Sequence, residues 1–172
     1  MILILPDLRT NANLVRDQAS SSAMTVSCTI SSILQDKGAQ LWAISPEATV
    51  FEAIELMAEK NVGALLVMSG ERLLGMMTER DYTRKVALHG KNSKETRVRE
   101  IISSSYTSVT PFHTVEDCMH LMTNHRVRHL PVLEGDRVTG IVSIGDLVNW
   151  TINAQHEAIH QLESYIAGQY PG

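Results

Sequence analysis

Apolar residues recur with the three-and-four spacing of a helical face in two stretches of the chain. They are Val50, Ala53, Ile54, Met57 and Ala58 in the first stretch, and Val115, Cys118, Met119 and Met122 in the second. Thr49 precedes the first stripe and Glu52 lies three positions after it, which is the pattern of a capping box. We therefore predict a helix in each stretch, the first beginning directly after Thr49.

Each predicted helix is followed by two short apolar runs joined by a polar turn. The first pair is GALLVM and RLLGMMT around the turn SGER, and the second pair is RHLPVL and RVTGIVS around EGDR. Apolar runs that flank a turn containing glycine are typical of β-hairpins. A further helix is predicted after each hairpin, so each half of the chain has the order strand, helix, strand, strand, helix.

The two halves are copies of one unit. Residues 46–84 align without a gap on residues 111–149. The identical pairs are Pro46/Pro111, Thr49/Thr114, Val50/Val115, Leu56/Leu121, Met57/Met122, Val62/Val127, Leu65/Leu130, Val67/Val132, Gly70/Gly135, Arg72/Arg137, Gly75/Gly140 and Asp81/Asp146. Upstream of them, ISSIL (30–34) resembles VREII (98–102). One copy leaves the apolar face of its sheet exposed, whereas two packed copies bury it.

This duplication divides the chain. We predict a polar N-terminal extension (residues 1–26), a first repeat (27–88), a linker (89–97), a second repeat (98–152) and a C-terminal amphipathic helix (153–172).

Composition limits the partners and the location. The chain has 172 residues, 44% of them hydrophobic, a net charge of −4 and two cysteines. Its charge balance does not favour a nucleic-acid or anionic-membrane partner, and no apolar run approaches membrane-spanning length. Two cysteines argue against a disulfide framework and fit a reducing compartment. We expect a cytoplasmic protein, with an organellar matrix as the alternative.

A hydroxyl and an aspartate mark the start of the helix after each hairpin: Thr78 and Asp81 in the first copy, Ser143 and Asp146 in the second. One interpretation is a simple capping box. The other is a site in which the carboxylate accepts ribose hydroxyls, while the hydroxyl and the backbone N–H groups face a phosphate. Two features favour the site: aspartate is short for a capping-box partner, and a glycine three positions before each hydroxyl leaves room for a ligand.

The repeated pattern G-h-h-[ST]-x-x-D (h is apolar), the proline before each first helix, and the tracts TERDYTRK, HRVRHLPV and VSIGDLV resemble the CBS-domain pair, or Bateman module. The likeness is greatest to its stand-alone bacterial and plant-organellar members and covers residues 27–152. It implies an α+β fold of two CBS repeats packed pseudo-symmetrically, followed here by the C-terminal helix. It also implies a non-catalytic module that binds adenosine nucleotides between the repeats, pairs into homodimers and signals to a protein target not identified by the sequence.

The resemblance also implies which residues bind the nucleotide. Backbone around Ile44–Pro46 and Val109–Pro111 would read the adenine edge, although proline near a helix start is also an ordinary turn. The arginines are candidates for phosphate contacts or for solvated surface. The full candidate set is Ile44, Pro46, Gly63, Ala64, Thr78, Arg80, Asp81, Val109, Thr110, Pro111, Arg126, Arg128, His129, Ser143 and Asp146.

The two predicted clefts differ in charge. Arg80, Arg84 and Lys85 surround Asp81, whereas the residues around Asp146 are uncharged: Ile144, Gly145, Asn149 and Trp150. Because extra phosphates gain most from extra cationic donors, the first cleft should prefer ATP, ADP or NAD and the second AMP. AMP is the ligand we expect first.

Other chemistries have weaker support. His125/His129 and His156/His160 are spaced four apart, but no third ligand is evident, so we expect no metal. Cys118 lies on a core-facing stripe, which indicates packing. No nucleophile–base pair or phosphate-binding glycine loop is present in the sequence, so we do not expect an enzyme. Two alternatives are a structural module with degenerate clefts and a redox-linked regulator of thioredoxin-type partners.

The end of the chain is amphipathic. Apolar residues at near-heptad spacing are Val148, Ile152, Ile159, Leu162 and Ile166. We predict a long helix, stopped at Gly168, that packs across a homodimer interface.

Overall fold

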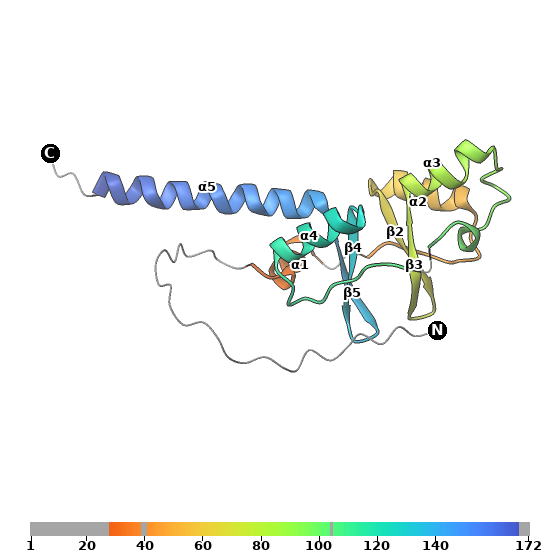
Figure 1. The fold of residues 1–172 in the computed structure, drawn as a ribbon, viewed down its shortest axis with the longest axis horizontal. Helices are drawn as coiled ribbons and strands as arrows, with labels where there is room; N and C mark the ends of the chain where they lie inside the picture. The colour runs from red at the N-terminus through yellow and green to blue at the C-terminus, as the bar shows by residue number, and fades with distance from the viewer. Residues whose placement is uncertain (1–27, 39–40, 104, 169–172) are drawn as a thin grey trace.

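The computed structural model describes residues 28–38, 41–103 and 105–168 (Figure 1). The predicted extension over residues 1–26 lies outside this part of the chain. The helices are α1 (Ile30–Lys37), α2 (Val50–Lys60), α3 (Glu79–Lys85), α4 (Val115–His125) and α5 (Ile144–Gly168), with 3₁₀ turns η1 (Ala87–His89) and η2 (Val98–Glu100). The strands are β1 (Ala43–Ile44), β2 (Ala64–Ser69), β3 (Arg72–Thr78), β4 (His129–Glu134) and β5 (Arg137–Ser143).

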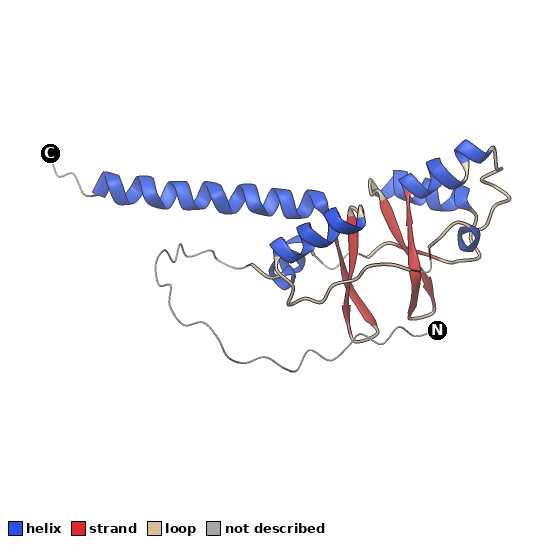
Figure 2. Cartoon of the chain, in the orientation of Figure 1, coloured by secondary structure: helices blue, strands red, loops and turns tan. Residues whose placement is uncertain are grey.

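Each repeat contains an antiparallel hairpin, β2–β3 in the first and β4–β5 in the second (Figure 2). In the first repeat β1 extends the sheet by pairing in parallel with β2. In the second repeat the corresponding strand is reduced to one parallel bridge, between Val109 and Val132. The predicted α+β fold of two repeats is therefore confirmed, with this one shortened strand.

The predicted start of α2 is confirmed by its capping box. The Thr49 hydroxyl accepts from the Glu52 N–H at 3.2 Å, and Glu52 Oε2 accepts from the Thr49 N–H at 2.7 Å. Thr114 and Asp117 form the same box at the start of α4. These caps satisfy backbone donors that have no partner within the helix.

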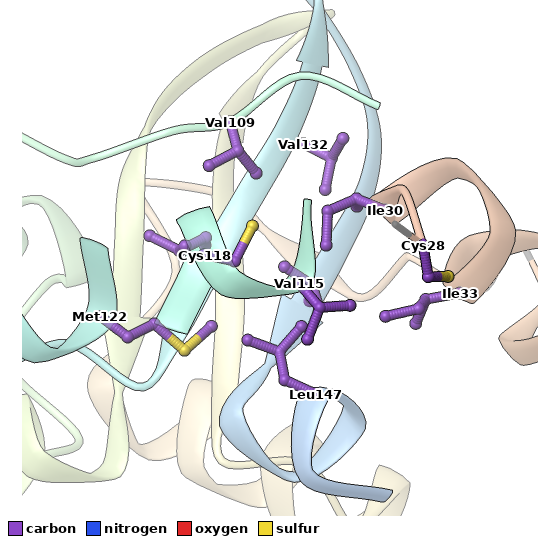
Figure 3. Close-up of a cluster of buried hydrophobic side chains, with 11 residues drawn as sticks. Cys28, Ile30, Ile33, Val109, Val115, Cys118, Met122, Val132 and Leu147 are labelled. Atoms are coloured by element: carbon purple, nitrogen blue, oxygen red, sulfur yellow. The ribbon is translucent and has the colours of Figure 1, made fainter. Parts of the chain in front are cut away.

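The core of the second repeat is completed by a segment at the start of the first repeat. Cys28, Ile30 and Ile33 belong to the buried cluster that contains Val115 and Cys118, and Figure 3 shows Ile30 and Ile33 beside Val115. Ile30 is fully buried, and its backbone N–H donates to the carbonyl of His113 at 2.9 Å. The helix α1 is therefore part of the second hydrophobic core although it lies at the start of the first repeat.

The first repeat is completed in the reciprocal way. Val98 and Ile101 lie at the start of the second repeat in sequence but are buried with Val50 and Met57 of α2. The Val98 N–H donates to the Ala48 carbonyl at 2.9 Å. We call residues 28–37 and 98–101 the crossed segments, because each closes the core of the more distant repeat.

The two repeats meet through their hairpins, which lie side by side in Figure 2. Leu66, Leu73 and Val138 are buried together between them, with Met76 and Leu133 packed against the cluster. This contact removes from water the apolar sheet faces that a single repeat exposes.

The glycines of the repeated motif make room for the crossed segments and the chain that follows them. A Cβ at Gly75 would lie 2.7 Å from the backbone oxygen of Ser103, and a Cβ at Gly140 would lie 2.5 Å from Cδ1 of Leu34 on α1. The space at these positions is filled by the protein itself. Contrary to the prediction, these glycines therefore do not leave room for a ligand.

This difference predicts unequal costs for two matched substitutions. Gly75→Ala meets a backbone carbonyl, so we expect the free energy of unfolding to fall by about 1–3 kcal/mol. Gly140→Ala meets only the end of a flexible leucine side chain, so its cost should be smaller. Urea unfolding of both variants measures this, and equal losses would contradict it.

Candidate functional site

Two related clefts lie between the repeats at the strand–helix junctions, and each takes one wall from each repeat. The first has a volume of about 590 Å³ and lies between the β3–α3 junction and the α4–β4 junction. Its lining residues are Gly63, Met76, Thr78, Glu79, Arg80, Asp81, Ser103, Ser105, Tyr106, Thr107, His125, Arg126, Val127, Arg128 and His129.

The second cleft has a volume of about 360 Å³ and lies between the β5–α5 junction and the α2–β2 junction. Its lining residues are Lys37, Gly38, Trp42, Lys60, Asn61, Val62, Gly63, Ala64, His129, Ile141, Ser143 and Asp146. In the alignment of the two copies, residues 60–64 correspond to residues 125–129, and Ser143 and Asp146 to Thr78 and Asp81. The clefts are therefore two copies of one arrangement, and both volumes suit a small ligand.

In the first cleft the predicted hydroxyl and carboxylate do form a capping box. Asp81 Oδ2 accepts from the backbone N–H of Thr78 at 3.1 Å and from its hydroxyl at 2.6 Å, while the Asp81 N–H donates to the same hydroxyl at 3.2 Å. Aspartate is thus long enough for the box, and the argument from its length was wrong. The other oxygen, Oδ1, forms an ion pair with Lys85 Nζ at 2.9 Å.

Asp146 is held in the same way, with a lysine that comes from the distant end of the chain. Its Oδ2 accepts from the N–H and the hydroxyl of Ser143, each at 2.7 Å, and from Lys37 Nζ on α1 at 2.7 Å. Burial raises the pKa of Asp146, but the hydrogen bonds from Lys37 and Ser143 outweigh this and hold the pKa below its usual range.

Lys37 also corrects the predicted charge of the second cleft. The cleft was expected to have a less charged rim than the first, but Lys37 and Lys60 both line it. No motif near Lys37 in the sequence predicts its ion pair with Asp146, because packing of the crossed segment brings the two residues together.

The first cleft is bridged by an arginine. Arg80 Nη1 donates to the backbone carbonyl of Arg126 at 2.8 Å, which links α3 of the first repeat to the end of α4 in the second. Arg126 has a left-handed backbone (φ 54°), and both Arg126 and Arg128 have exposed side chains. Arg84, which was predicted on this rim, lines neither cleft. The arginines of this cleft are therefore Arg80, Arg126 and Arg128.

Gly63 and His129 line both clefts and so form a shared wall. A Cβ at Gly63 would lie 3.6 Å from Cε1 of the imidazole, so the His129 ring lies beside the space that a side chain at position 63 would occupy. Burial lowers the pKa of His129, and Lys37 lowers it further, whereas Asp146 acts in the opposite direction. A neutral imidazole therefore separates the clefts near pH 7.

Five predicted residues lie outside the two clefts as described: Ile44, Pro46, Val109, Thr110 and Pro111. The carbonyls of Pro46 and Pro111 accept from Arg99 and Ser31, so both prolines dock a crossed segment. Chain slightly upstream lines the clefts instead, including Trp42 in the second and Tyr106 in the first. The adenine-binding role of the five residues stays a prediction.

The remaining candidate features are the thiol of Cys118, a metal site and a membrane-spanning helix. Cys118 is fully buried in the second core, as predicted, and burial raises the pKa of its thiol to about 11. Within the described ranges, no group of three His, Cys, Asp or Glu side chains is placed to hold a metal ion. None of the described helices is both long enough and apolar enough to cross a membrane.

A protein-family comparison matches the description "CBS domain" at residues 39–88 and again at residues 98–153. The chain belongs to the CBS-domain family. It is 40% identical over 154 residues to the CBS domain-containing protein CBSX3, mitochondrial, of Arabidopsis thaliana, covering 84% of this chain and 74% of that protein.

Solved structures of CBS-domain proteins are similar to this fold. A putative signal-transduction protein with CBS domains from Burkholderia ambifaria is 47% identical, with a TM-score of 0.71 over 74% of this chain and 96% of that chain. The CBS domain protein PAE2072 from Pyrobaculum aerophilum, solved in complex with AMP, shares the fold at 23% identity, with a TM-score of 0.61 over 69% of this chain and 88% of that chain.

The half-buried imidazole in the shared wall predicts a pH dependence of stability. Because the pKa of His129 is lowered in the fold, the unfolded chain takes up a proton that the folded chain does not as pH falls below about 6.5. The free energy of unfolding should therefore fall between pH 7 and about pH 5.5, and His129→Gln should reduce that fall. Urea midpoints at both pH values measure it; an unchanged pH dependence in the variant would contradict this role.

Proposed function

We propose that this CBS-domain protein is a non-catalytic regulatory module whose two clefts bind adenosine nucleotides and whose response is read by a protein partner. AMP is the first candidate, with ATP, ADP and NAD as alternatives. The observation that supports this most is the duplicated arrangement of hydroxyl, aspartate and cation at an inter-repeat cleft. The AMP complex of the Pyrobaculum protein, which has the same fold, is consistent with it.

The aspartates are suited to the ribose. In the second cleft both hydrogen bonds from Ser143 and the ion pair with Lys37 go to Oδ2 of Asp146. Oδ1 takes none of these contacts, so a ribose hydroxyl can donate to it while the capping box stays intact. In the first cleft Oδ1 of Asp81 is shared with Lys85. Charged acceptors of this kind form stronger hydrogen bonds than neutral ones.

The cations are suited to the phosphates. Arg126 and Arg128 are exposed at the first cleft, beside Arg80. The second cleft has the ammonium groups of Lys37 and Lys60. Guanidinium groups bind phosphate oxygens in pairs, whereas an ammonium acts as a point charge. We therefore retain the proposal that the first cleft prefers ATP, ADP or NAD and the second AMP. Its basis is that the first cleft has arginines and the second has lysines, since both clefts contain cations.

The signal would be a change in how the repeats sit against each other. Each cleft has one wall from each repeat, and the Arg80–Arg126 hydrogen bond spans the first. A ligand that contacts both walls favours the arrangement in which they fit it, and so shifts the population toward that state. We place this module, as a homodimer, in the cytoplasm or an organellar matrix.

The ribose assignment predicts the effect of two substitutions. Asp81→Asn and Asp146→Asn should each raise the dissociation constant of one site roughly ten- to a hundredfold, since a charged hydrogen bond contributes about 1.5–3 kcal/mol. Calorimetry with AMP measures both sites. Asp117→Asn is the matched control, because it weakens the same kind of capping box on α4 outside both clefts. Unchanged AMP affinity in the Asp81/Asp146 double variant would overturn the assignment.

The cation assignment predicts a change in phosphate preference. In an Asp146→Asn background, which isolates the first cleft, Arg126→Gln with Arg128→Gln should weaken ATP binding more than AMP binding. The difference should shrink as salt screens the charges. Competition titrations of the two nucleotides measure it, with Arg84→Gln as the exposed control outside both clefts. Equal losses for AMP and ATP would show that these arginines do not select for phosphate number.

A further inference from the structure

Most of α5 extends away from the repeats as a single arm (Figure 1). Its first turns are anchored, since Leu147 is fully buried in the second core. Beyond them a row of apolar side chains is exposed to solvent: Val148 (42%), Ile152 (46%), Ile159 (53%), Leu162 (63%) and Ile166 (59%). The family match ends at residue 153, so the outer part of the arm is additional to the CBS repeats.

An arm of this kind needs a partner. A short helix without tertiary packing is only marginally stable in water. A continuous row of exposed apolar side chains marks an interaction site. The residue types along this row indicate which partner binds to it.

The exposed row follows a heptad repeat in which two positions, a and d, face the partner. The a positions are Ile152, Ile159 and Ile166, and the d positions are Val148, Gln155 and Leu162. Isoleucine at all three a positions, with leucine at one d position (Leu162), agrees with the pattern that favours two parallel strands. The apolar pattern extends over the exposed arm at every a and d position except the polar Gln155.

We propose that the arm binds a second copy of this chain, with the two α5 helices forming a parallel, in-register, two-stranded coiled coil. This assigns a specific element and orientation to the homodimer proposed above, and it does not depend on nucleotide binding.

Gln155 supplies the argument for this occupant and this orientation. In a parallel pair, Gln155 lies opposite Gln155 of the partner, and each amide has both the donor and the acceptor that the other needs. In an antiparallel pair centred on the same row, Gln155 lies opposite Ile159 of the partner, which leaves a buried amide without a hydrogen bond. An identical parallel helix is thus the polar complement of this surface.

The flanking positions agree with self-association. Thr151, His156 and Ala158 flank the seam, and Glu163 is the one acidic residue beside it in the described arm. Identical arms therefore do not face like-charged rows across the seam. The seam has far fewer than the roughly 20–30 residues per side of a standard interface, so we expect a reversible, concentration-dependent dimer.

The first experiment measures assembly of the full chain by sedimentation velocity across a concentration series. Ile159→Glu places a charge in the seam and should raise the dimer dissociation constant at least about tenfold. Gln161→Glu places the same charge on the outer face and should leave the constant unchanged. The thermal unfolding of the CBS repeats should be the same in both variants, because the arm lies outside their cores.

The second experiment tests orientation by oxidation under native conditions. Gln155→Cys should cross-link to its own equivalent as a disulfide dimer, because a parallel pair places these positions opposite each other. Gln161→Cys, on the outer face, should not. The native Cys28 and Cys118 are buried and serve as the background.

Three results would overturn the proposal. The first is a dimer constant that Ile159→Glu does not change. The second is a failure of Gln155→Cys to cross-link while Ile159→Glu still dissociates the dimer. The third is a monomeric wild-type chain whose arm is protected from hydrogen exchange only while residues 1–26 are present, which would assign the row to the chain's own N-terminal extension.

Discussion

The packing of the crossed segments determines the rest of the structure. Neither repeat closes its hydrophobic core with its own residues alone: Ile30 and Ile33 complete the second core, and Val98 and Ile101 complete the first. Because each core needs apolar surface from the other side of the molecule, the repeats are held as one unit by burial rather than by their shared face alone. The clefts follow from this, since the crossed segments and the chain after them supply Lys37 to one cleft and Ser103 to the other.

The same short motif serves two purposes at different places in the fold. Boxes at the starts of α2 and α4 cap helices whose carboxylates are exposed. Boxes at the starts of α3 and α5 cap helices at the floor of a cleft, where the carboxylates are partly buried and each pairs with a lysine. Capping and ligand binding are compatible, because a carboxylate has more acceptor sites than a cap uses. Position and the neighbouring cation distinguish the two roles, and the motif alone does not.

The sequence was sufficient for what is local or repeated. Helical stripes, hairpin turns and the capping box of Thr49 depend on neighbours a few positions apart, and the duplication implied two related clefts with Asp81 and Asp146 in them. The sequence was insufficient where segments that are far apart along the chain come into contact. Nothing near Lys37 indicates a partner at Asp146, and the motif glycines were assigned to a ligand because the approach of Ser103 and Leu34 has no sequence signature. The upstream lining at Trp42 and Tyr106 was missed for the same reason.

Crossed packing also sets the order in which the chain can fold as it is made. The first core closes once residue 101 has been synthesised, because Val98 and Ile101 are its last members. Helix α1 is synthesised before that core, yet its partners on α4 and α5 are synthesised last. Domains usually form from the N-terminus onward during translation. Here α1 can pack only after α4 and the start of α5 have been synthesised. The second core therefore forms after most of the chain has been made, through contacts between residues far apart in sequence.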